Sequence, residues 1–421
     1  MAKMRTQINS LMPRSIDYLC AVCKSPNTLN KPPGQQTLCQ HSDCERLLGL
    51  EVKNDFYFLL QGAGDGNYGN SGHVYKAQKL GDTENFYAVK IFHQNLNQNS
   101  LEKSLNREIK CLKNLNDKGV RVPKYIDHLC PSQITEATPY VVVLEYVDGK
   151  NLEKCIQERQ RNVTNGNILF KEKEIFDFFI DLLETLYLIH QKGETIHRDI
   201  KPANIVKQKE TNKLYLVDFG SAKVLELVDN YQTEVAFTRA YATPELFLRR
   251  KNESMITSTG LNTFINDDKY KYTHDLYSVA LTICDLITAG EIKKNCNYDR
   301  ESPFYNEFWE AWMSEVCTKA PKLGIILKRM LSFYPPHRYH SALEVLLIVR
   351  AIAWKAWGED KWLIGDQQWL RDVKRKFQTA QKEPQYTDDF LANILIKDFL
   401  EKSEECRRKE NVKILLDKYR D

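Results

Sequence analysis

Residues 197–204 read His-Arg-Asp-Ile-Lys-Pro-Ala-Asn, and residues 218–220 read Asp-Phe-Gly. The first block supplies a carboxylate, a lysine and an amide, and the second adds another carboxylate. Carboxylate and amide oxygens are the ligands that Mg²⁺ prefers in proteins. Either block alone would carry little weight, because short motifs recur by chance. Together, in this order and at this spacing, they leave little room for coincidence.

The two blocks resemble the catalytic loop and the metal-binding triplet of the eukaryotic-type protein kinases. The resemblance implies that Asp199 takes the proton of an acceptor hydroxyl group and that Lys201 neutralises charge on the γ-phosphoryl group. It also implies that Asn204 and Asp218 hold Mg²⁺ on ATP. His197 would support the loop rather than carry a proton. Because the whole catalytic set is present, we expect an active enzyme and not a pseudokinase.

Residues 67–77 resemble the glycine-rich loop of the same family. Gly69 and Gly72 would let main-chain N–H groups approach phosphate oxygens. Lys90 matches the lysine that pairs with the α- and β-phosphates, and Glu108 matches the helix glutamate that holds this lysine. An ammonium group between apolar strand residues needs such a partner.

The resemblance also places the adenine base. Val74, Ala88 and Val206 would enclose the base, and Leu144 would be the gatekeeper residue. Main-chain groups from Glu145 to Val147 would bond the edge of the base. These side chains are also ordinary core residues, and both interpretations can hold.

Three positions bear on the acceptor. Lys201 stands two residues after Asp199, as in the Ser/Thr kinases of the family, and Thr238 matches the threonine that supports this lysine. Serine and threonine are therefore favoured over tyrosine. Ala203 and Asn151 occupy the places of two acids that select arginine in substrates, so we expect no strong preference for basic substrates.

A further set separates protein kinases from small-molecule kinases with a similar core. Glu245 and Arg338 resemble the buried ion pair of the helical lobe, and Asp275 resembles the helix acid that anchors the catalytic loop. The set favours a protein substrate, the kinase itself included. The rival hypotheses are a catalytically silent binding scaffold and a small-molecule phosphotransferase.

Four cysteines lie close together near the N-terminus, as Cys20-x₂-Cys23 and Cys39-x₄-Cys44. Two close pairs joined by a loop are typical of a zinc ribbon, and a segment this short needs a metal or disulfides to hold it. We expect structural Zn²⁺ on these cysteines, with His41 as an alternative ligand. Unrelated free thiols and a redox role are the competing interpretations. Such heads resemble those of certain cyanobacterial Ser/Thr kinases.

Composition excludes several other classes. The chain has 421 residues, 42 % apolar and 28 % charged, with a net charge of +4. This charge is too small to indicate a nucleic-acid partner. No apolar run is long enough to cross a membrane and no signal peptide is visible, so we expect a cytoplasmic protein. The eleven cysteines should then be reduced.

We expect an α+β protein with the bilobal protein-kinase fold, a small β-rich lobe followed by a larger helical lobe. The predicted parts are an N-terminal tail (1–14), the zinc-ribbon-like segment (15–50), the kinase domain (52–354) and a helical C-terminal extension (355–421). The extension would dock on the kinase or recruit a partner protein, and the cysteine-rich segment is the other place where a partner protein would bind. Strands are expected within 56–75 and at 86–92, 140–146 and 214–217. Helices are expected at 101–115, 172–190, 274–288, 325–331 and 342–354, with a left-handed cap at Lys192-Gly193.

Overall fold

The structure is a computed structural model of the chain. It describes residues 15–19, 26–30, 36–38, 47–62, 68–69, 72–92, 98–130, 139–162, 170–225, 238–246, 270–290, 292 and 309–357. The chain divides into two compact units. One comprises residues 1–148 with 217–222, and the other comprises residues 149–216 with 223–421.

The first unit is built on a large antiparallel sheet. Its strands follow the order β3-β4-β5-β7-β8-β10-β9, and the short β6 pairs with β7. The strands are β3 (Gln36–Leu38), β4 (Leu47–Val52), β5 (Asp55–Gly62), β6 (Tyr68–Gly69), β7 (Gly72–Lys79), β8 (Tyr87–Phe92), β9 (Tyr125–Leu129) and β10 (Val141–Glu145). The strands expected within 56–75 and at 86–92 and 140–146 are thereby confirmed.

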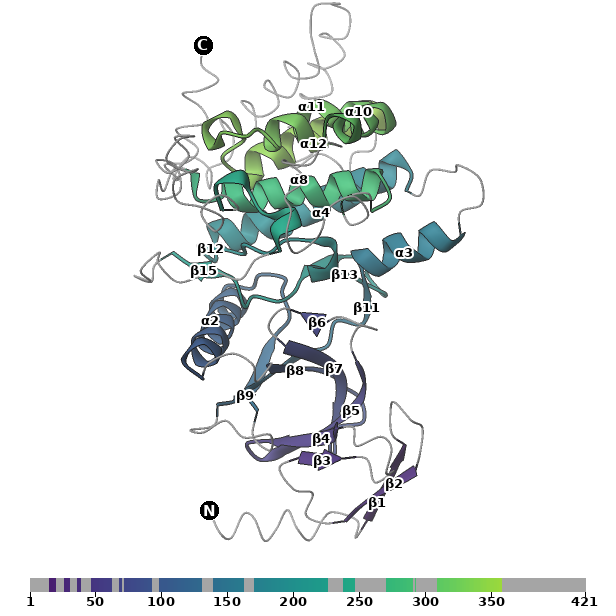
Figure 1. The fold of residues 1–421 in the computed structure, drawn as a ribbon, viewed down its shortest axis with the longest axis vertical. Helices are drawn as coiled ribbons and strands as arrows, with labels where there is room; N and C mark the ends of the chain where they lie inside the picture. The colour runs from purple at the N-terminus through teal and green to yellow at the C-terminus, as the bar shows by residue number, and fades with distance from the viewer. Residues whose placement is uncertain are drawn as a thin grey trace, which may run out of the picture. The chain divides into compact units, whose positions relative to one another are not determined.

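One face of this sheet carries the hydrophobic core of the unit. Side chains alternate between the two faces of a strand, so every second residue points into the core. The core members all lie on that face: Leu50, Val52, Tyr57, Leu59, Ala77, Val89, Val141 and Val143. The sheet curls around them until β4 contacts β9 (Figure 1). Lys53, in the β4–β5 turn, forms an ion pair with Asp127 on β9.

The sheet also crosses the domain boundary expected near residue 51. β3 and β4 come from the predicted cysteine-rich segment, yet β3 pairs with β4, and β4 pairs with β5 from Gly49↔Phe58 to Val52↔Asp55. Further toward the N-terminus, β1 (Ser15–Leu19) and β2 (Pro26–Asn30) form a separate hairpin. The four cysteines and the tail at 1–14 lie outside the described residues, so those assignments stay predictions.

In the described part of the first unit, one helix lies beside the sheet. Helix α2 (Gln98–Asp117) contacts β9 and β10, and it carries the helix expected at 101–115. Its buried leucines recur at helical spacing, as Leu101, Leu105, Leu112 and Leu115. This pattern gives the helix one apolar side, which packs on the sheet.

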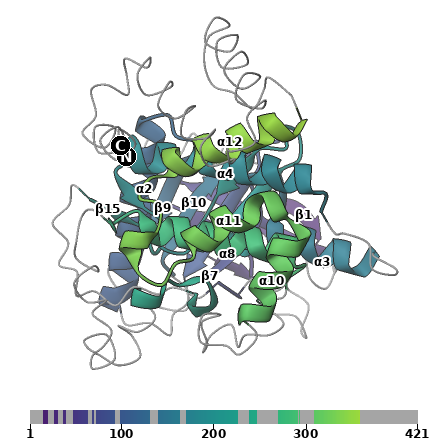
Figure 2. The ribbon, with the colours of Figure 1, turned by 90° about the horizontal axis from the view of Figure 1, so that it is seen from above.

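The second unit is mostly helical. Within the described residues, its helices are α3 (Leu152–Asn162), α4 (Glu172–Gln191), α8 (Thr273–Ile287), α10 (Trp309–Lys319), α11 (Pro321–Met330) and α12 (Ala342–Trp357). Helix α12 runs alongside α4, and α11 packs on α8 (Figure 2). One apolar face of α4 is buried, at Ile175, Phe179, Leu182, Leu186 and Ile189.

Two small sheets support the loops of the second unit. Strands β11 (Gly149–Asn151), β13 (Ile205–Gln208) and β14 (Leu214–Leu216) form one, and β12 (Thr195–Ile196) pairs with β15 (Lys223–Val224) in the other. The connections contain short 3₁₀ turns, at Pro202–Asn204, Arg239–Tyr241 and Pro335–His337. The first of these turns contains the end of the 197–204 block.

The predicted cap of α4 was wrong in its details. Lys192 and Gly193 both donate their main-chain N–H groups to the carbonyl of Leu188, but the left-handed residue is Glu194, with φ of 45°. Helices commonly end at a glycine in the left-handed conformation. Here the left-handed residue comes one position after Gly193, where the chain continues directly into β12.

None of the helices in the described ranges is both long enough and apolar enough to cross a membrane. The cysteines within those ranges form no disulfide with one another: Cys111, Cys130, Cys155, Cys284 and Cys317. The polar segment at 252–268 and the extension beyond Trp357 fall outside the described residues.

Candidate active site

Four predicted nucleotide-binding residues share one face of the sheet in the first unit. In the register of the sheet, Val74 lies opposite Lys90, and Leu144 lies opposite Ala88. All four point away from the core, because the residues between them, such as Val89, belong to it. The sequence predicted these residues from motifs far apart in the chain, and the strand pairing brings them together.

Lys90 is the centre of a buried ionic cluster in this unit. Its ammonium lies 2.8 Å from a carboxylate oxygen of Glu108 on α2 and 2.6 Å from Oδ1 of Asp218. Burial alone would lower the pKa of Lys90, but the charges of Asp218 and Glu108 outweigh it and raise the pKa above its ordinary value. The lysine is therefore held as a cation, as a residue that binds phosphate must be.

Glu108 depends on that lysine for its charge. The side chain is fully buried, and burial raises the pKa of its carboxyl while the charge of Lys90 opposes the rise. Within the described part of the chain its Oε1 has no hydrogen-bond partner. A buried carboxylate of this kind is costly without its cation.

The Asp218-Phe219-Gly220 triplet is shaped by its backbone. Asp218 has φ of 64°, a left-handed conformation that is uncommon outside glycine and asparagine. The next glycine, Gly220, lies so close that an added Cβ would stand 3.3 Å from Oδ1 of Asp218. Arg107 donates to the carbonyl of Gly220 at 3.4 Å. The turn thereby aims the Asp218 carboxylate at the lysine.

Of the two glycines assigned to phosphate, Gly72 has a clear packing constraint. It pairs with Gly69 at the end of the β6–β7 hairpin, and an added Cβ would stand 2.3 Å from the carbonyl oxygen of Ile91. No real Cβ tolerates this distance from a main-chain atom, so only glycine fits. The loop between β5 and β6, which holds the other glycines of the motif, lies outside the described residues.

The segment after β10 is tied to its neighbours by main-chain hydrogen bonds at two of its residues. The N–H of Glu145 donates to the carbonyl of Lys124 at 2.8 Å, and the N–H of Tyr146 donates to the carbonyl of Phe86 at 3.3 Å. Within the described residues, the N–H of Val147 has no such main-chain partner. Among the amides that the sequence assigned to the base edge, Val147 is thus the one without a main-chain partner in the described residues.

In the second unit, the catalytic-loop residues form one hydrogen-bonded network. Asp199 accepts a bond from the main-chain N–H of Thr238 at 3.0 Å and one from the Asn204 side-chain amide at 3.1 Å. The ammonium of Lys201 lies 3.0 Å from Asp199 and donates to the Thr238 hydroxyl group at 2.5 Å. The contact expected between Lys201 and Thr238 is therefore present.

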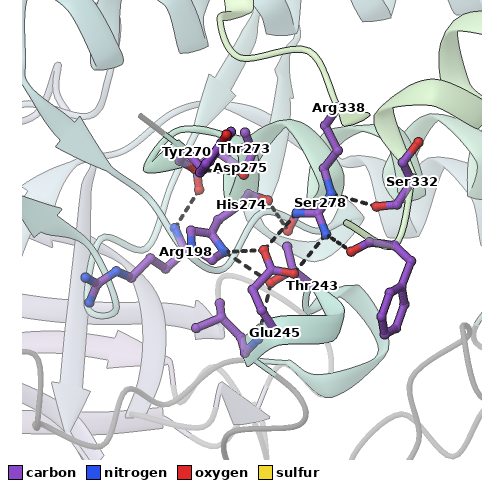
Figure 3. Close-up of polar contacts among 12 residues, drawn as sticks. Arg198, Thr243, Glu245, Tyr270, Thr273, His274, Asp275, Ser278, Ser332 and Arg338 are labelled. Atoms are coloured by element: carbon purple, nitrogen blue, oxygen red, sulfur yellow. Dashed lines mark hydrogen bonds and ion pairs between the residues drawn. The ribbon is translucent and has the colours of Figure 1, made fainter. Parts of the chain in front are cut away.

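The loop is anchored by Asp275 on α8. This buried carboxylate accepts a hydrogen bond from the main-chain N–H of Arg198 at 2.8 Å (Figure 3). It also accepts one from the main-chain N–H of His197 at 2.8 Å and lies 2.9 Å from Nε2 of His190. Burial alone would raise the pKa of Asp275, but the bond from His190 and the neighbouring groups lower it. Arg198 has φ of 68°, and the anchor holds this strained residue in place.

Arg338 and Glu245 form the predicted buried ion pair. Two guanidinium nitrogens lie 2.7 and 2.8 Å from the two carboxylate oxygens (Figure 3). Arg338 also donates to the carbonyls of Ser332 and Phe333. The guanidinium group thus has a carboxylate and two main-chain carbonyl oxygens as hydrogen-bond partners. A buried ion pair is stable only when its remaining polar atoms are satisfied in this way.

A pocket of about 150 Å³ adjoins the catalytic loop in the same unit. Its walls come from α3, α8, Pro202 and Tyr241, and it contains two acids, Glu153 and Asp285. Tyr241 donates its hydroxyl to Asp285 at 2.7 Å. The sequence argument about arginine missed both acids, because it considered only the two matched positions. One of these, Asn151, instead accepts the Lys154 N–H at the start of α3. The lack of arginine preference stays a prediction.

Val206 lies on β13, in the second unit, where it pairs with Asn151 and Tyr215. Cys20, Cys23, Cys39 and Cys44 lie outside the described residues. Within those residues, no group of three or more histidines, cysteines or acids could hold a metal ion. The zinc assignment therefore stays a prediction.

Comparison with known proteins decides the family. Residues 63–398 match the family model described as "Protein kinase domain". The chain belongs to this family. As a member of the protein kinase domain family, it has the catalytic-loop network and the buried Lys90–Glu108 pair where the motifs placed them.

Three curated relatives share 26–30 % sequence identity with the chain. The chain is 30 % identical over 236 residues to "Serine/threonine-protein kinase B" of Synechocystis sp., which covers 54 % of this chain and 34 % of the relative. It is 28 % identical over 295 residues to "Serine/threonine-protein kinase F" of the same organism, covering 67 % and 52 %. It is 26 % identical over 210 residues to PknA of Nostoc sp., covering 50 % and 32 %. The chain thus spans between a third and a half of the length of these curated relatives.

Proposed function

We propose that the chain is a serine/threonine protein kinase that transfers the γ-phosphoryl group of Mg-ATP to hydroxyl groups of proteins, its own included. The observation that carries the proposal is the network of Asp199, Lys201, Asn204 and Thr238. It combines a proton acceptor, a cation and an amide in one hydrogen-bonded group. Membership of the protein kinase domain family and the names of the curated relatives support the same activity.

Asp199 is the residue that orients the acceptor hydroxyl group. Its carboxylate is fixed from two directions, by the Thr238 N–H and the Asn204 amide. A fixed carboxylate can align an incoming hydroxyl group and accept its proton as the bond to phosphorus forms. Phosphoryl transfer depends chiefly on such positioning and on charge stabilisation.

Lys201 supplies positive charge beside that carboxylate. Its bond to Thr238 and its contact with Asp199 hold the ammonium in place before any substrate binds. A preorganised cation stabilises the negative charge on the phosphoryl oxygens during transfer. The family's Ser/Thr enzymes share this lysine, which supports serine and threonine as acceptors.

The nucleotide requires a second set of groups. Lys90, held by Glu108, would bind the α- and β-phosphates, and the Val147 N–H would bond the base. Asp218 and Asn204 both present oxygen atoms, which suit Mg²⁺. When bound, Mg²⁺ neutralises charge on the triphosphate. Asn204 uses its amide nitrogen toward Asp199, so its oxygen is the atom that remains for the metal.

Transfer of label from [γ-³²P]ATP tests the proposal. The purified chain should label itself or a panel of candidate proteins on serine or threonine, and Asp199→Asn should lower the rate by ~10²-fold or more while nucleotide binding persists. A silent scaffold would bind nucleotide without transfer in both forms. A small-molecule phosphotransferase would label no protein. Either of these results would refute the proposal.

We propose in addition that Cys20, Cys23, Cys39 and Cys44 bind a structural Zn²⁺. Each cysteine pair falls in the connection between two paired strands: residues 20–25 join β1 to β2, and residues 39–46 join β3 to β4. In both connections the first residue is a cysteine. Hairpins that each contribute two thiolates are the usual basis of a closed four-cysteine zinc site.

Metal analysis of the full chain tests this second proposal. One zinc per chain is expected in the wild type, and the double variant Cys20→Ser/Cys39→Ser should lose it. The matched control is Cys130→Ser, which removes an exposed cysteine on the first unit. Absence of zinc from protein purified without chelator would leave the free-thiol interpretation. Zinc retained by the double variant would point to other ligands.

A further inference from the structure

A cation lies between two aromatic rings on the outer part of the nucleotide face. The ammonium of Lys76 stands 3.8 Å from the centre of the Phe86 ring and 4.7 Å from the centre of the Tyr146 ring. The rings meet edge to face, with centres 6.5 Å apart and planes at 70°. We call these three residues the Lys76 cluster.

The position of the cluster connects it to the nucleotide-binding residues. Lys76 is two residues beyond Val74 on β7 and lies opposite Ala88 on β8, so it shares their face of the sheet. Tyr146 comes from the segment after β10, between Glu145 and Val147. The cluster therefore spans from the strands that would enclose the base to the segment that would bond its edge.

Glu145 is tied to the sheet by its pairing with Tyr87 and by hydrogen bonds with Lys124, and Tyr146 is the next residue along the chain. The Tyr146 N–H donates to the Phe86 carbonyl at 3.3 Å, a long hydrogen bond. Phe86 is 40 % exposed, so burial alone does not fix the position of its ring. A cation facing both rings attracts each of them, because the face of an aromatic ring is negative. The charge of Lys76 thereby fixes Phe86 and Tyr146 against each other.

We propose that the Lys76 cluster is a positioning device that holds the main chain at 145–147 in the geometry that binds the nucleotide base. The inference rests on the proposed nucleotide binding and deepens it. Lys76 acts through the ring of Tyr146 on the neighbouring Val147 N–H and need not touch the ligand. Its loss should weaken nucleotide binding and leave the transfer step unchanged, since Asp199 and Lys201 belong to a different network.

Two substitutions separate the charge from the packing of the lysine stem. Lys76→Met keeps an apolar chain of similar length and removes the cation, whereas Lys76→Arg keeps the cation and also stacks on aromatic rings. The matched control is Lys79→Met on the same strand. Lys79 forms an ion pair with Asp55 at 2.7 Å and takes no part in the cluster.

The test measures binding of ADP and ATP to the full chain by calorimetry, and kcat and KM for ATP in the label-transfer assay. Lys76→Met is expected to raise Kd and KM for the nucleotide by about three- to tenfold, the range that one cation–π contact allows, with kcat within about twofold. Lys76→Arg should restore wild-type values, and Lys79→Met should not differ from the wild type. Phe86→Leu should repeat the effect of Lys76→Met.

Three results would overturn the inference: Lys76→Met no weaker in binding than Lys79→Met, Lys76→Arg as weak as Lys76→Met, or a fall in kcat with KM unchanged. A wild-type chain that binds no nucleotide would instead overturn the proposed function. Thermal unfolding of each variant confirms that the compared proteins are folded.

Discussion

The ammonium of Lys90 and the carboxylate of Glu108 lie 2.8 Å apart, with side chains no more than 4 % exposed. Removing one partner of such a pair leaves the other as an uncompensated buried charge. Lys90→Met should therefore lower the free energy of unfolding by about 3–5 kcal/mol. The double variant Lys90→Met/Glu108→Gln should recover part of that loss, because it no longer buries an unpaired carboxylate. Chemical denaturation of the four proteins in this double-mutant cycle measures both effects.

An exposed ion pair provides the comparison for this cycle. Lys79 and Asp55 are each about a third exposed, and such pairs contribute about 0–1 kcal/mol. The same cycle at Lys79 and Asp55 should show little coupling. Equal coupling energies at the two places would mean that burial does not govern the Lys90–Glu108 pair.

Glu245 should make the stability of the protein depend on pH. Burial alone would raise the pKa of this carboxyl, but the charge and hydrogen bonds of Arg338 prevail and lower it below its ordinary value of 4.5. A carboxyl group with a lowered pKa in the folded state stabilises the fold fully above its unfolded pKa. This contribution is lost as the pH falls from there toward the folded value.

Glu245→Gln isolates this contribution. The difference in unfolding free energy between wild type and variant should be constant from about pH 6 to pH 7 and should shrink below about pH 4.5, where the unfolded carboxyl takes up a proton. Denaturant titrations at a series of pH values measure it. A difference that stays flat through pH 4 would show that the carboxyl ionises no more readily in the fold than in the unfolded chain.

The parts of the site that the sequence predicted are those written in short motifs. Asp199, Lys201 and Asn204 lie within one block, so local chain geometry already sets their separation. The Lys201–Thr238 and Glu245–Arg338 contacts join distant segments, and only the resemblance to a family made them predictable. No local pattern implies that the Nζ of Lys201 would bond the hydroxyl of Thr238.

Features that no sequence motif marks could not be predicted from the sequence. The pocket acids Glu153 and Asp285 lie on two helices that meet only in the folded unit. The Lys76 cluster likewise depends on strand register, which sequence alternation limits but does not fix. The chain exit from α4 shows the same effect on a small scale, because pairing of β12 with β15 places the left-handed residue at Glu194 instead of Gly193.

Leu50 tests whether the predicted cysteine segment is part of the kinase sheet. Its side chain is 1 % exposed and belongs to the core of the first unit. Leu50→Ala should lower the free energy of unfolding by about 2–5 kcal/mol, the usual loss for a large apolar side chain in a core. The neighbouring Glu51→Ala, on the opposite face of β4, should cost little. Chemical denaturation distinguishes the two. If both variants matched the wild type, residues 47–52 would be an appendage and not a structural strand.

Thr238 offers the sharpest test of the catalytic network, because its two bonds come from different atoms. The main-chain N–H donates a hydrogen bond to Asp199, and the hydroxyl group accepts one from the Lys201 ammonium. Thr238→Val keeps the first bond and the shape of the side chain but removes the second. A hydrogen bond to a charged group contributes about 1.5–3 kcal/mol, so kcat should fall by about tenfold or more with KM for ATP little changed. Thr238→Ser restores a hydroxyl group and should retain most of the activity. Steady-state kinetics of the three proteins, with thermal unfolding to confirm the fold, give the answer. A valine variant as active as the serine variant would show that Lys201 reaches its working position without the threonine.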